Sequence, residues 1–257
     1  MGRWVLLLGV FALLATTQPS WAGGERTNLC AGPEELLTTD ASLSRLAAAI
    51  AAGGPVDVLA IGSATTVGSV TSTGEQSASQ SGAFPWHLIR ALHAAVPAVE
   101  FRLTVRGGRG MTAEDMLPLL DAALKKHRYP LVLWQTGTVE AVRGLQPGGM
   151  LDILHAGAEK VREAGGDLIL IDPQFSRFLR ANTDLDPYES VMQQVATMPG
   201  VALFHRFELM RAWAYDGRMD LERTGKADRD KALEDLNGCL GKSLARFILS
   251  GANVVKR

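Results

Sequence analysis

The sequence predicts an α/β fold: a three-layer α/β/α sandwich around a doubly wound, five-stranded parallel sheet. Five short apolar runs alternate along the chain with longer segments that have the hydrophobic period of amphipathic helices. Near-continuous apolar strands of this kind are typical of a parallel sheet whose two faces are both covered. Neither an internal repeat nor a break in composition divides the chain, so we expect a single domain over residues 23–257.

The first helix is expected over Thr39–Ala52, with Asp40 or Ser42 as its N-cap, and it ends at Gly53-Gly54-Pro55. The strands are expected at Val56–Ile61, Val99–Val105, Leu131–Gln135, Asp167–Ile171 and Val201–Phe204. The other helices are expected at Phe84–Ala95, Ala113–Lys126, Gly149–Ala164, Pro187–Met198, Phe207–Tyr215 and Cys239–Leu249. Two polar segments remain between these elements. Ser69–Gly82 is a low-complexity loop, either a plain surface loop or a lid beside a site, and Asp216–Asp235 carries both charges, as a solvated face does.

The N-terminus has the organisation of a secretory signal peptide. Arg3 precedes an apolar run over Trp4–Ala15, and the small residues Ser20 and Ala22 come just before the expected cleavage site, which follows Ala22. We therefore expect residues 1–22 to be removed and the mature chain to be exported, to a periplasm or to the outside of the cell. The apolar run is too short to cross a bilayer comfortably, so an uncleaved anchor is the weaker alternative and the mature chain is expected not to be transmembrane.

Composition excludes two classes of function. The formal net charge is −1, which gives no electrostatic footprint for nucleic acid. The two cysteines, Cys30 and Cys239, lie near opposite ends of the mature chain, and in an oxidising compartment we expect them to form one disulfide. Two buried free thiols are the alternative. Neither cysteine has a CxxC partner or a nearby histidine, so we expect no metal and no cofactor.

The segment Val56–Gly68, with the sequence VDVLAIGSATTVG, marks the candidate site. An apolar run ends in a glycine, small hydroxyl residues follow, and a second glycine closes the turn. Such a turn lies at the carboxyl edge of a parallel sheet, where open α/β folds bind their ligands.

This turn is the first of four segments that resemble the blocks of the SGNH (GDSL-type) esterase and lipase superfamily, in particular its exported bacterial members. AIGSATTVG is similar to the superfamily's G-[DS]-S-x-T-x-G turn, and the positions that match are Gly62, Ser63, Thr66 and Gly68. Ala64 stands where the resemblance places the nucleophilic serine. The resemblance covers the mature chain from about Cys30 to the last helix and implies the same flavodoxin-like sheet.

The second and third blocks supply the oxyanion hole in this superfamily. VRGGRG, residues 105–110, is similar to its N-R-G-x-x-G block, and the resemblance implies that the backbone N–H of Gly107 is an oxyanion donor. WQTGTVE, residues 134–140, is similar to a G-T-N turn in which Gly137 and Thr138 fit. Val139 replaces the asparagine whose side-chain amide would complete the hole.

The fourth block carries the catalytic acid and histidine in the superfamily. When Cys239-Leu240 is set against a Cys-Leu pair of the exported members, Asp228 takes the acid position and Lys231 the histidine position. A shift of several residues instead brings Glu234 or Asp235 to the acid position and Asn237 to that of the histidine. No register supplies a histidine, because the last one in the chain is His205.

These replacements bear directly on the chemistry that the resemblance implies. There, a serine hydroxyl attacks an acyl carbonyl, a histidine takes its proton, an aspartate orients the histidine, and amide donors hold the oxyanion. Alanine offers no nucleophile, valine offers no donor, and a lysine with an ordinary pKa near ~10.4 is protonated at neutral pH. We therefore predict a catalytically inactive, exported member that binds an acyl ester, a carbohydrate or an envelope protein.

Two alternatives stay open. The chain is an active acyl or acetyl esterase with non-standard residues, in which Ser63 is the nucleophile and Lys231 the base, or it is a purely structural subunit of an envelope complex. Ser63 is next to the expected position, and a shift by one residue in a tight turn moves the hydroxyl by several ångströms, which argues against the rescue.

Other polar residues at the predicted edge are candidates for ligand binding. Asp172 and Gln174 lie in the D-P-Q segment after the fourth strand, and Arg106 follows the second strand, with Arg109 and Arg143 on nearby loops. His205 ends the fifth strand, three residues before Glu208, and as a lone histidine we expect it to be structural. The remaining histidines are expected to have packing or solvent roles, namely His87, His93, His127 and His155.

Overall fold

A computed structural model describes residues 1, 28–68 and 82–254 of the chain. The expected signal peptide after Met1 and the expected loop before Gly82 lie outside these residues. One sheet of five strands forms the centre, and all neighbouring strands are parallel in the order β2-β1-β3-β4-β5. The strands are β1 (Val56–Gly62), β2 (Phe101–Gly107), β3 (Leu131–Gln135), β4 (Asp167–Ile171) and β5 (Val201–Phe204). The predicted three-layer α/β/α fold is confirmed.

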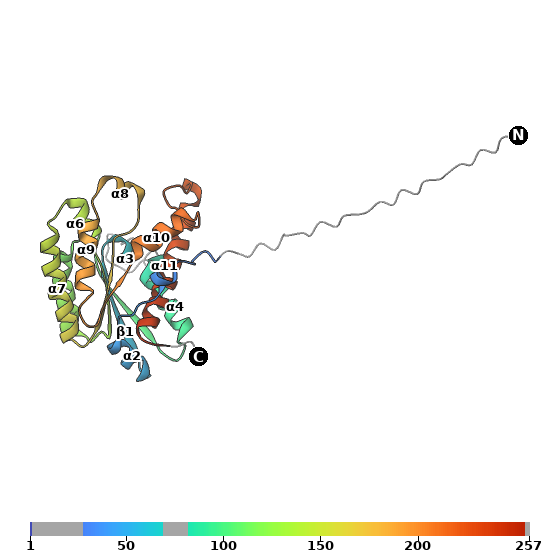
Figure 1. Cartoon of the computed structure of the whole chain (residues 1–257). Coiled ribbons are helices and arrows are strands. Elements are labelled where there is room, and N and C mark those ends of the chain that lie inside the picture. Colours follow the sequence, from blue (N-terminus) through green and yellow to red (C-terminus); the bar gives the residue numbers. More distant parts are fainter. Residues whose placement is uncertain (2–27, 69–81, 255–257) are drawn as a thin grey trace.

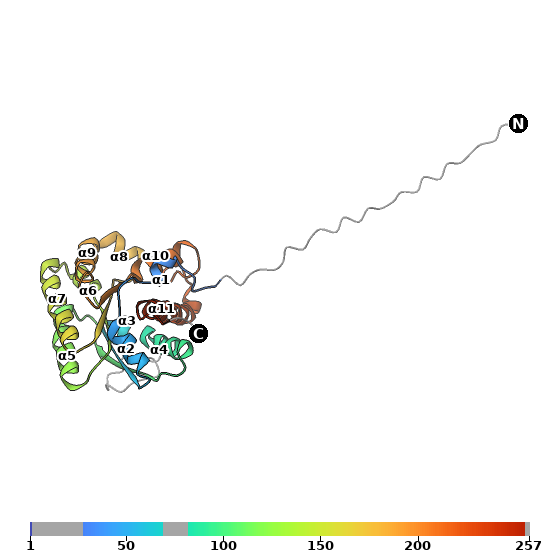
Figure 2. The ribbon, with the colours of Figure 1, turned by 60° about the horizontal axis from the view of Figure 1, so that its bottom comes forward.

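The helices lie on both faces of this sheet, as Figures 1 and 2 show. Those of eight or more residues are α2 (Ser44–Ala51), α4 (Phe84–Ala95), α5 (Ala113–Lys126), α7 (Pro147–Glu163), α9 (Asp186–Val195), α10 (Arg206–Tyr215) and α11 (Arg229–Gly251). Shorter ones are α1 (Glu34–Leu37), α3 (Ala64–Val67), α6 (Thr138–Arg143), α8 (Arg177–Asn182) and the 3-10 helix η2 (Lys226–Asp228). Helices α5, α7 and α9 cover one face, while α2, α4 and α11 cover the other.

Alternation along the buried strands produces the two cores. In β1, Val58 and Ala60 face the side of α4 and α11, whereas Leu59 and Ile61 face the side of α5 and α7. All of these side chains are fully buried, as the predicted parallel sheet with two covered faces requires.

The strand order also defines where a ligand site belongs. The chain passes from β1 to β2 on one side and then returns to β3 on the other side of β1. In doubly wound sheets, the crevice at this reversal, beyond the carboxyl ends of the strands, is the common binding position. The turn after β1 and the end of β3 therefore meet at the expected place.

The first long helix begins later than the sequence predicts. Its N-cap is Leu43, which makes no side-chain capping bond, so the expected caps Asp40 and Ser42 are wrong. The buried Asp167 of β4 replaces them: its Oδ2 accepts hydrogen bonds from the backbone N–H groups of Arg45 and Leu46, both at 2.9 Å. Burial raises the pKa of this carboxyl, and the two backbone donors oppose that rise.

The closing helix is longer than predicted. The sequence predicts Cys239–Leu249, whereas α11 runs over Arg229–Gly251, because the end of the charged stretch is helical. Lys231 and Asp235, four residues apart, pair on this exposed turn with 2.5 Å between Nζ and Oδ2. Helix α7 begins at Pro147, two residues before its predicted start, since proline suits the first turn of a helix.

The predicted disulfide is confirmed. Cys30 and Cys239 are bonded across a sequence separation of 209 residues. The disulfide fastens residues 28–39, here called the N-terminal strap, to α11. Hydrogen bonds also hold the strap; among them, the indole Nε1 of Trp213 donates to Ala31 O at 2.8 Å, and the N–H of Thr39 donates to Ser250 Oγ at 2.9 Å.

Within residues 28–68 and 82–254, no helix combines the length and the apolar character needed to cross a membrane.

Replacing Asp167 tests the long-range cap of α2. Asp167→Ala leaves the buried N–H of Leu46 and the partly buried N–H of Arg45 without this acceptor and is expected to lower the free energy of unfolding by about 1–3 kcal/mol. Asp167→Asn keeps an acceptor oxygen and is expected to lose less. Urea denaturation measures both. The exposed Asp152→Ala on α7 is the control, and an equal effect of the two alanine variants would contradict the assignment.

Candidate active site at the carboxyl edge of the sheet

The turn after β1 holds the residue that corresponds to the nucleophile. Strand β1 ends at Gly62, Ser63 is the N-cap, and Ala64 is the first residue of α3. Ala64 is half-buried, so this position does face the surface at the sheet edge. It presents a methyl group, which has no lone pair to attack a carbonyl.

Gln135, the last residue of β3, holds this turn together. Its Oε1 accepts from the backbone N–H and the hydroxyl of Ser63, both at 3.2 Å. The same oxygen accepts from the hydroxyls of Thr65 at 3.2 Å and of Thr66 at 3.0 Å. Because a backbone N–H only donates, the amide must turn its oxygen toward Ser63. Ser63 is therefore buried and engaged within its own turn.

Sequence reasoning missed Gln135. A polar residue at the end of an otherwise apolar buried strand, LVLWQ, was the available signal, because a buried amide requires partners.

Gly107 lies opposite Gly62, and only glycine fits there. The two residues are partners in the β1–β2 register, and Gly107 has a φ of +121°. A Cβ at Gly107 would lie 2.0 Å from the carbonyl oxygen of Gly62. The match of Gly107 to the second block thus has a steric cause in this structure.

The arginines near this edge differ in their contacts. Arg106 is exposed and its Nη1 donates to the backbone oxygen of Val105 at 2.9 Å. Arg143, on α6, donates from Nη2 to Gly110 O at 2.9 Å and so links α6 to the loop after β2. Arg109 is exposed on that loop. Arg109 lies on a loop, as predicted, whereas Arg106 is still within β2 and Arg143 is the last residue of α6, so their predicted loop placement is wrong. The role of the three arginines in ligand binding stays a prediction.

The third block is held by a carboxylate that the sequence analysis missed. The buried Glu140 accepts from Ala113 N at 2.5 Å and Thr136 Oγ1 at 2.6 Å through Oε1, and from Gly137 N at 2.9 Å through Oε2. It joins the end of β3 to the start of α5. Val139, one residue earlier in α6, is half-buried and offers no donor from its side chain.

The fourth block is exposed. Asp228 ends η2, and Lys231 follows in the first turn of α11 with 78% of its side chain exposed. Its ion pair with Asp235 raises the pKa of Lys231, so the amine stays protonated at neutral pH. Among the described residues, no hydrogen bond or ion pair joins Asp228 or Lys231 to Ser63 or Ala64.

The shifted register brings no base to the turn either. Glu234 lies 3.3 Å from the imidazole Nε2 of His87 in α4, measured from Oε1. Asn237 is half-buried in α11.

A histidine–carboxylate pair lies at the ends of β4 and β5, which the sequence analysis did not foresee as a pair. His205 Nδ1 is 3.6 Å from Oδ2 of the buried Asp172. The backbone N–H of Phe207 donates to Asp172 Oδ1 at 2.8 Å. Burial raises the pKa of Asp172, and the nearby carboxylate of Asp172 raises the pKa of His205, whose side chain is 36% exposed. Gln174, two residues on, is half-buried.

Arg206 connects this pair to the nucleophile turn. It is fully buried, its Nε donates to Asp172 O at 3.1 Å, and its Nη1 donates to Thr65 Oγ1 at 3.1 Å. Burial lowers its pKa to about 10. Its Nη2 has no hydrogen-bond partner within the described part of the chain. Arg206 is the first residue of α10, and its position in the sequence carries no signal for this contact with Thr65 across the sheet edge.

Further acidic residues surround His205. Glu189, in α9, lies near Asp172 and Glu208, and burial together with these charges raises its pKa to about 7. Glu208 is paired with Arg211 one turn later in α10. The acidic half of the edge therefore lies around β4 and β5, while the turn of Ala64 lies at β1.

The other histidines have structural contacts. His93 Nε2 lies 3.2 Å from Phe101 O, His127 Nε2 lies 3.0 Å from Asp57 Oδ2, and His155 is exposed on α7. Among the described residues, no group of three or more His, Cys, Asp or Glu side chains is arranged to hold a metal ion.

Together, the sheet order, the glycine turn after β1 and the glycine at the end of β2 define a protein of the SGNH hydrolase fold. The chain belongs to the non-GDSL lipase-like family, whose model matches residues 29–254.

Solved structures with the same fold include esterases. TesA has 21% sequence identity and a TM-score of 0.52, with 72% of this chain and 97% of TesA covered. LAE5, an α/β hydrolase enzyme from the metagenome of Lake Arreo, Spain, has 18% identity and a TM-score of 0.59, with 77% and 95% covered. A mutant of Axe2, an acetyl-xylooligosaccharide esterase from Geobacillus Stearmophilus, has 16% identity and a TM-score of 0.56, with 78% and 95% covered. A comparison with curated proteins finds no match.

Removing the amide of Gln135 tests its role as the acceptor of the turn. Gln135→Met keeps the length of the side chain but leaves the buried N–H of Ser63 and three hydroxyls without this oxygen. We expect the free energy of unfolding to fall by about 2–3 kcal/mol. The exposed Gln146→Met, before α7, is the matched control and should stay within about 0.5 kcal/mol of the parent chain. Equal effects in urea denaturation would refute the assignment.

The raised pKa of Glu189 predicts a pH-dependent gain from Glu189→Gln. Because the pKa of Glu189 rises from 4.5 to about 7 on folding, the folded chain binds more protons than the unfolded chain between these values. This group therefore contributes a loss of stability as the pH rises through that window. The amide removes the loss, so the variant should gain about 1–2 kcal/mol at pH 8, after allowance for solvent screening, and little at pH 4.5.

Thermal unfolding at the two pH values measures this difference. Glu163→Gln, at the exposed end of α7, is the control and should show no such trend. A gain from Glu189→Gln of the same size at both pH values would mean that the charge of this carboxyl is not the cause.

Proposed function

We propose that this chain is an exported, non-hydrolytic member of the SGNH hydrolase fold that binds an ester-bearing ligand at the carboxyl edge of its sheet. The observation that carries the proposal is the hydrogen-bonded state of the nucleophile turn. Ala64 has no hydroxyl, and the hydroxyls of Ser63, Thr65 and Thr66 all bond to Gln135 Oε1. A serine hydrolase instead needs a hydroxyl bonded to a general base.

The absence of a suitable base supports the same proposal. Lys231 is exposed, protonated and paired with Asp235, so it has no lone pair with which to accept a proton from Ser63. Removing the nucleophile or base of a serine hydrolase lowers kcat by about 10⁶, and the losses of nucleophile and base do not add. Once the nucleophile is lost, losing the base as well therefore costs little further activity.

The proposed binding role rests on the glycines and the exposed arginines at the carboxyl edge of the sheet. Gly107 and Gly137, both at positive φ, keep the ends of β2 and β3 free of side chains, because a Cβ there would meet Gly62 O or Pro173. Arg106 and Arg109 are exposed beside them. An edge with bare backbone and exposed arginines suits a ligand that offers carbonyl oxygens to backbone N–H groups and hydroxyl oxygens to arginine.

The ligand class is proposed by analogy with structures of the same fold. Axe2 is described as an acetyl-xylooligosaccharide esterase, and a two-domain esterase with a TM-score of 0.55 is described as active on acetylated mannans. We infer that an acetylated oligosaccharide or a short acyl ester is the first ligand to test here. Export is supported by the signal-like N-terminus and by the disulfide between Cys30 and Cys239.

One observation favours the alternative of an active ester hydrolase. Asp172 and His205 form a carboxylate–histidine pair of the type that serves as a general base, and Arg206 joins Asp172 O to the hydroxyl of Thr65. In this alternative, His205 would be the base in place of Lys231.

An esterase assay separates the two functions. The purified mature chain is expected to hydrolyse short acyl p-nitrophenyl esters no faster than Ser63→Ala or His205→Ala, because no hydroxyl is paired with a base. Acetylated xylo-oligosaccharide is expected to raise the melting temperature of the parent chain, since a ligand that binds only the folded state stabilises it. Val139→Trp, which fills the edge, should remove the rise.

Two outcomes would contradict the proposal. Turnover that His205→Ala or Ser63→Ala abolishes would establish an active hydrolase. A rise in melting temperature that Val139→Trp leaves intact would place the ligand elsewhere.

A further inference from the structure

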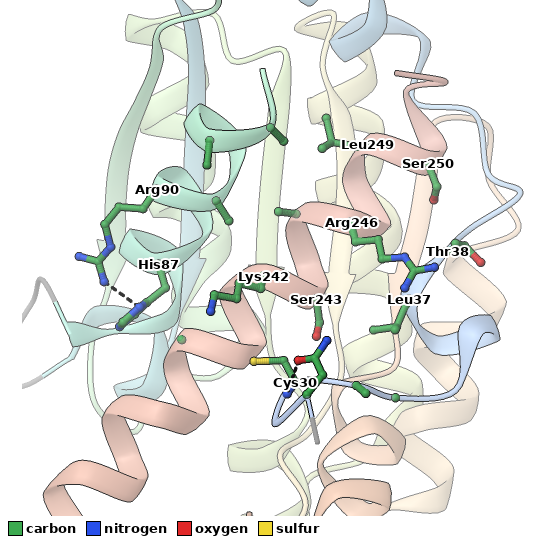
Figure 3. A pocket seen from close by; sticks show the side chains of 18 of the residues that line it. Cys30, Leu37, Thr38, His87, Arg90, Lys242, Ser243, Arg246, Leu249 and Ser250 are labelled. Atoms are coloured by element: carbon green, nitrogen blue, oxygen red, sulfur yellow. Dashed lines mark hydrogen bonds between the residues drawn. The ribbon is translucent and has the colours of Figure 1, made fainter. Parts of the chain in front are cut away.

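A separate groove lies on the outer surface of the helix layer formed by α4 and α11. It has a volume of about 940 Å³ and is closed on one side by the N-terminal strap. Figure 3 shows its three walls: His87 and Arg90 come from α4, Lys242 and Arg246 from α11, and Cys30 and Leu37 from the strap. None of the candidate residues at the sheet edge lines it.

The floor of the groove is apolar. Small aliphatic side chains of α4 and α11 line it, joined by larger ones from α11 and the strap; they are Ala91, Ala94, Ala95, Ala245, Leu249 and Leu37. Volumes of about 300–1,000 Å³ are typical of pockets for small molecules. A groove floor lined by alanines accommodates a narrow, flexible chain rather than a bulky ring.

The charged side chains that line the groove are all positively charged. Arg90, Lys242 and Arg246 line it, and no carboxylate does. Arg246 is paired with Glu34 of the strap, whereas Arg90 and Lys242 form no ion pair within residues 28–68 and 82–254. His87 is neutral in this arrangement, because its Nδ1 accepts from Arg90 Nη2 at 2.7 Å and burial lowers the pKa of the imidazole.

The walls are fixed before any ligand arrives. The disulfide holds Cys30 against α11, and the bonds from Trp213 to Ala31 O and from Thr39 to Ser250 Oγ, at 2.8 and 2.9 Å, hold the rest of the strap. In addition, Arg218 Nη1 donates to Asn28 O at 2.8 Å. A preformed site loses less conformational entropy on binding than a site that must be assembled.

We propose that this groove binds a single-chain anionic amphiphile of the fatty-acid type. The acyl chain lies along the alanine floor, and the carboxylate lies between Arg90 and Lys242. An apolar floor and a purely cationic set of side chains together favour this ligand over an uncharged or a cationic amphiphile. The site is distinct from the sheet edge and does not depend on the function proposed for that edge.

Three probes with the same chain and different head groups test the proposal on the full, disulfide-bonded protein. Isothermal titration should give the tightest binding for laurate, at least tenfold weaker binding for dodecyl maltoside, and none for dodecyltrimethylammonium. Equal affinity for laurate and dodecyl maltoside would overturn the proposal, because the cations would then contribute nothing.

Variants locate the site. The double variant Arg90→Gln/Lys242→Gln should weaken laurate binding at least tenfold, and Ala94→Trp, which fills the floor, should abolish it. Lys126→Gln/Arg128→Gln, an exposed pair formed by the last residue of α5 and a residue just after it, is the matched control and should bind laurate like the parent chain. Circular dichroism confirms that each variant is folded.

The last comparison distinguishes this groove from the sheet edge. Val139→Trp should leave laurate binding unchanged, while Ala94→Trp should leave ester binding at the edge unchanged. If Val139→Trp abolishes laurate binding and Ala94→Trp does not, the amphiphile binds at the edge and the groove proposal is wrong.

Discussion

The carboxyl edge of this molecule depends on one oxygen atom, Oε1 of Gln135. The strand order reverses between β1 and β3, and at this edge the turn after β1 has a buried N–H and three hydroxyls that need an acceptor. The amide oxygen from the neighbouring strand accepts from all of them. The same bonds that make the turn rigid also withdraw its hydroxyls from chemistry. The hydrogen bonds to Gln135 therefore explain both the rigidity of the turn and the lack of a free hydroxyl in it. The missing hydroxyl at Ala64 adds to this.

Charge is divided between two regions of the molecule. Carboxylates gather around His205 at the ends of β4 and β5, with the buried guanidinium of Arg206 between them and the turn. In the outer helix layer, Arg90, Lys242 and Arg246 line the groove, and no carboxylate is part of its lining. An anionic ligand is thus favoured in the groove and disfavoured at the ends of β4 and β5. A chain with a formal net charge of −1 conceals this division, which appears only when the residues are placed in space.

The fold could be predicted because its signals are local. Apolar runs such as LVLWQ locate the strands, and alternation with helices determines a parallel sheet. The start of α2 was misplaced because its cap, Asp167, is 122 residues away from Arg45 in the sequence. The glycines and Ala64 of the site were found from motif positions, but Gln135, Glu140 and Arg206 were not. Each of them bonds to a segment far away in the sequence: Gln135 to Ser63, Glu140 to Ala113 and Arg206 to Thr65. The local sequence around a side chain does not reveal such a distant partner.

The disulfide has a mechanical consequence. All five strands lie between Cys30 and Cys239, so a force applied at the two chain ends passes from one cysteine to the other through the covalent bond. The covalent path of that load therefore bypasses the five strands. Tension on the oxidised chain acts instead on the packing of α11 beyond Cys239, which belongs to the core on one face of the sheet. Reduction would transfer the whole load to the hydrogen bonds and packing of the domain.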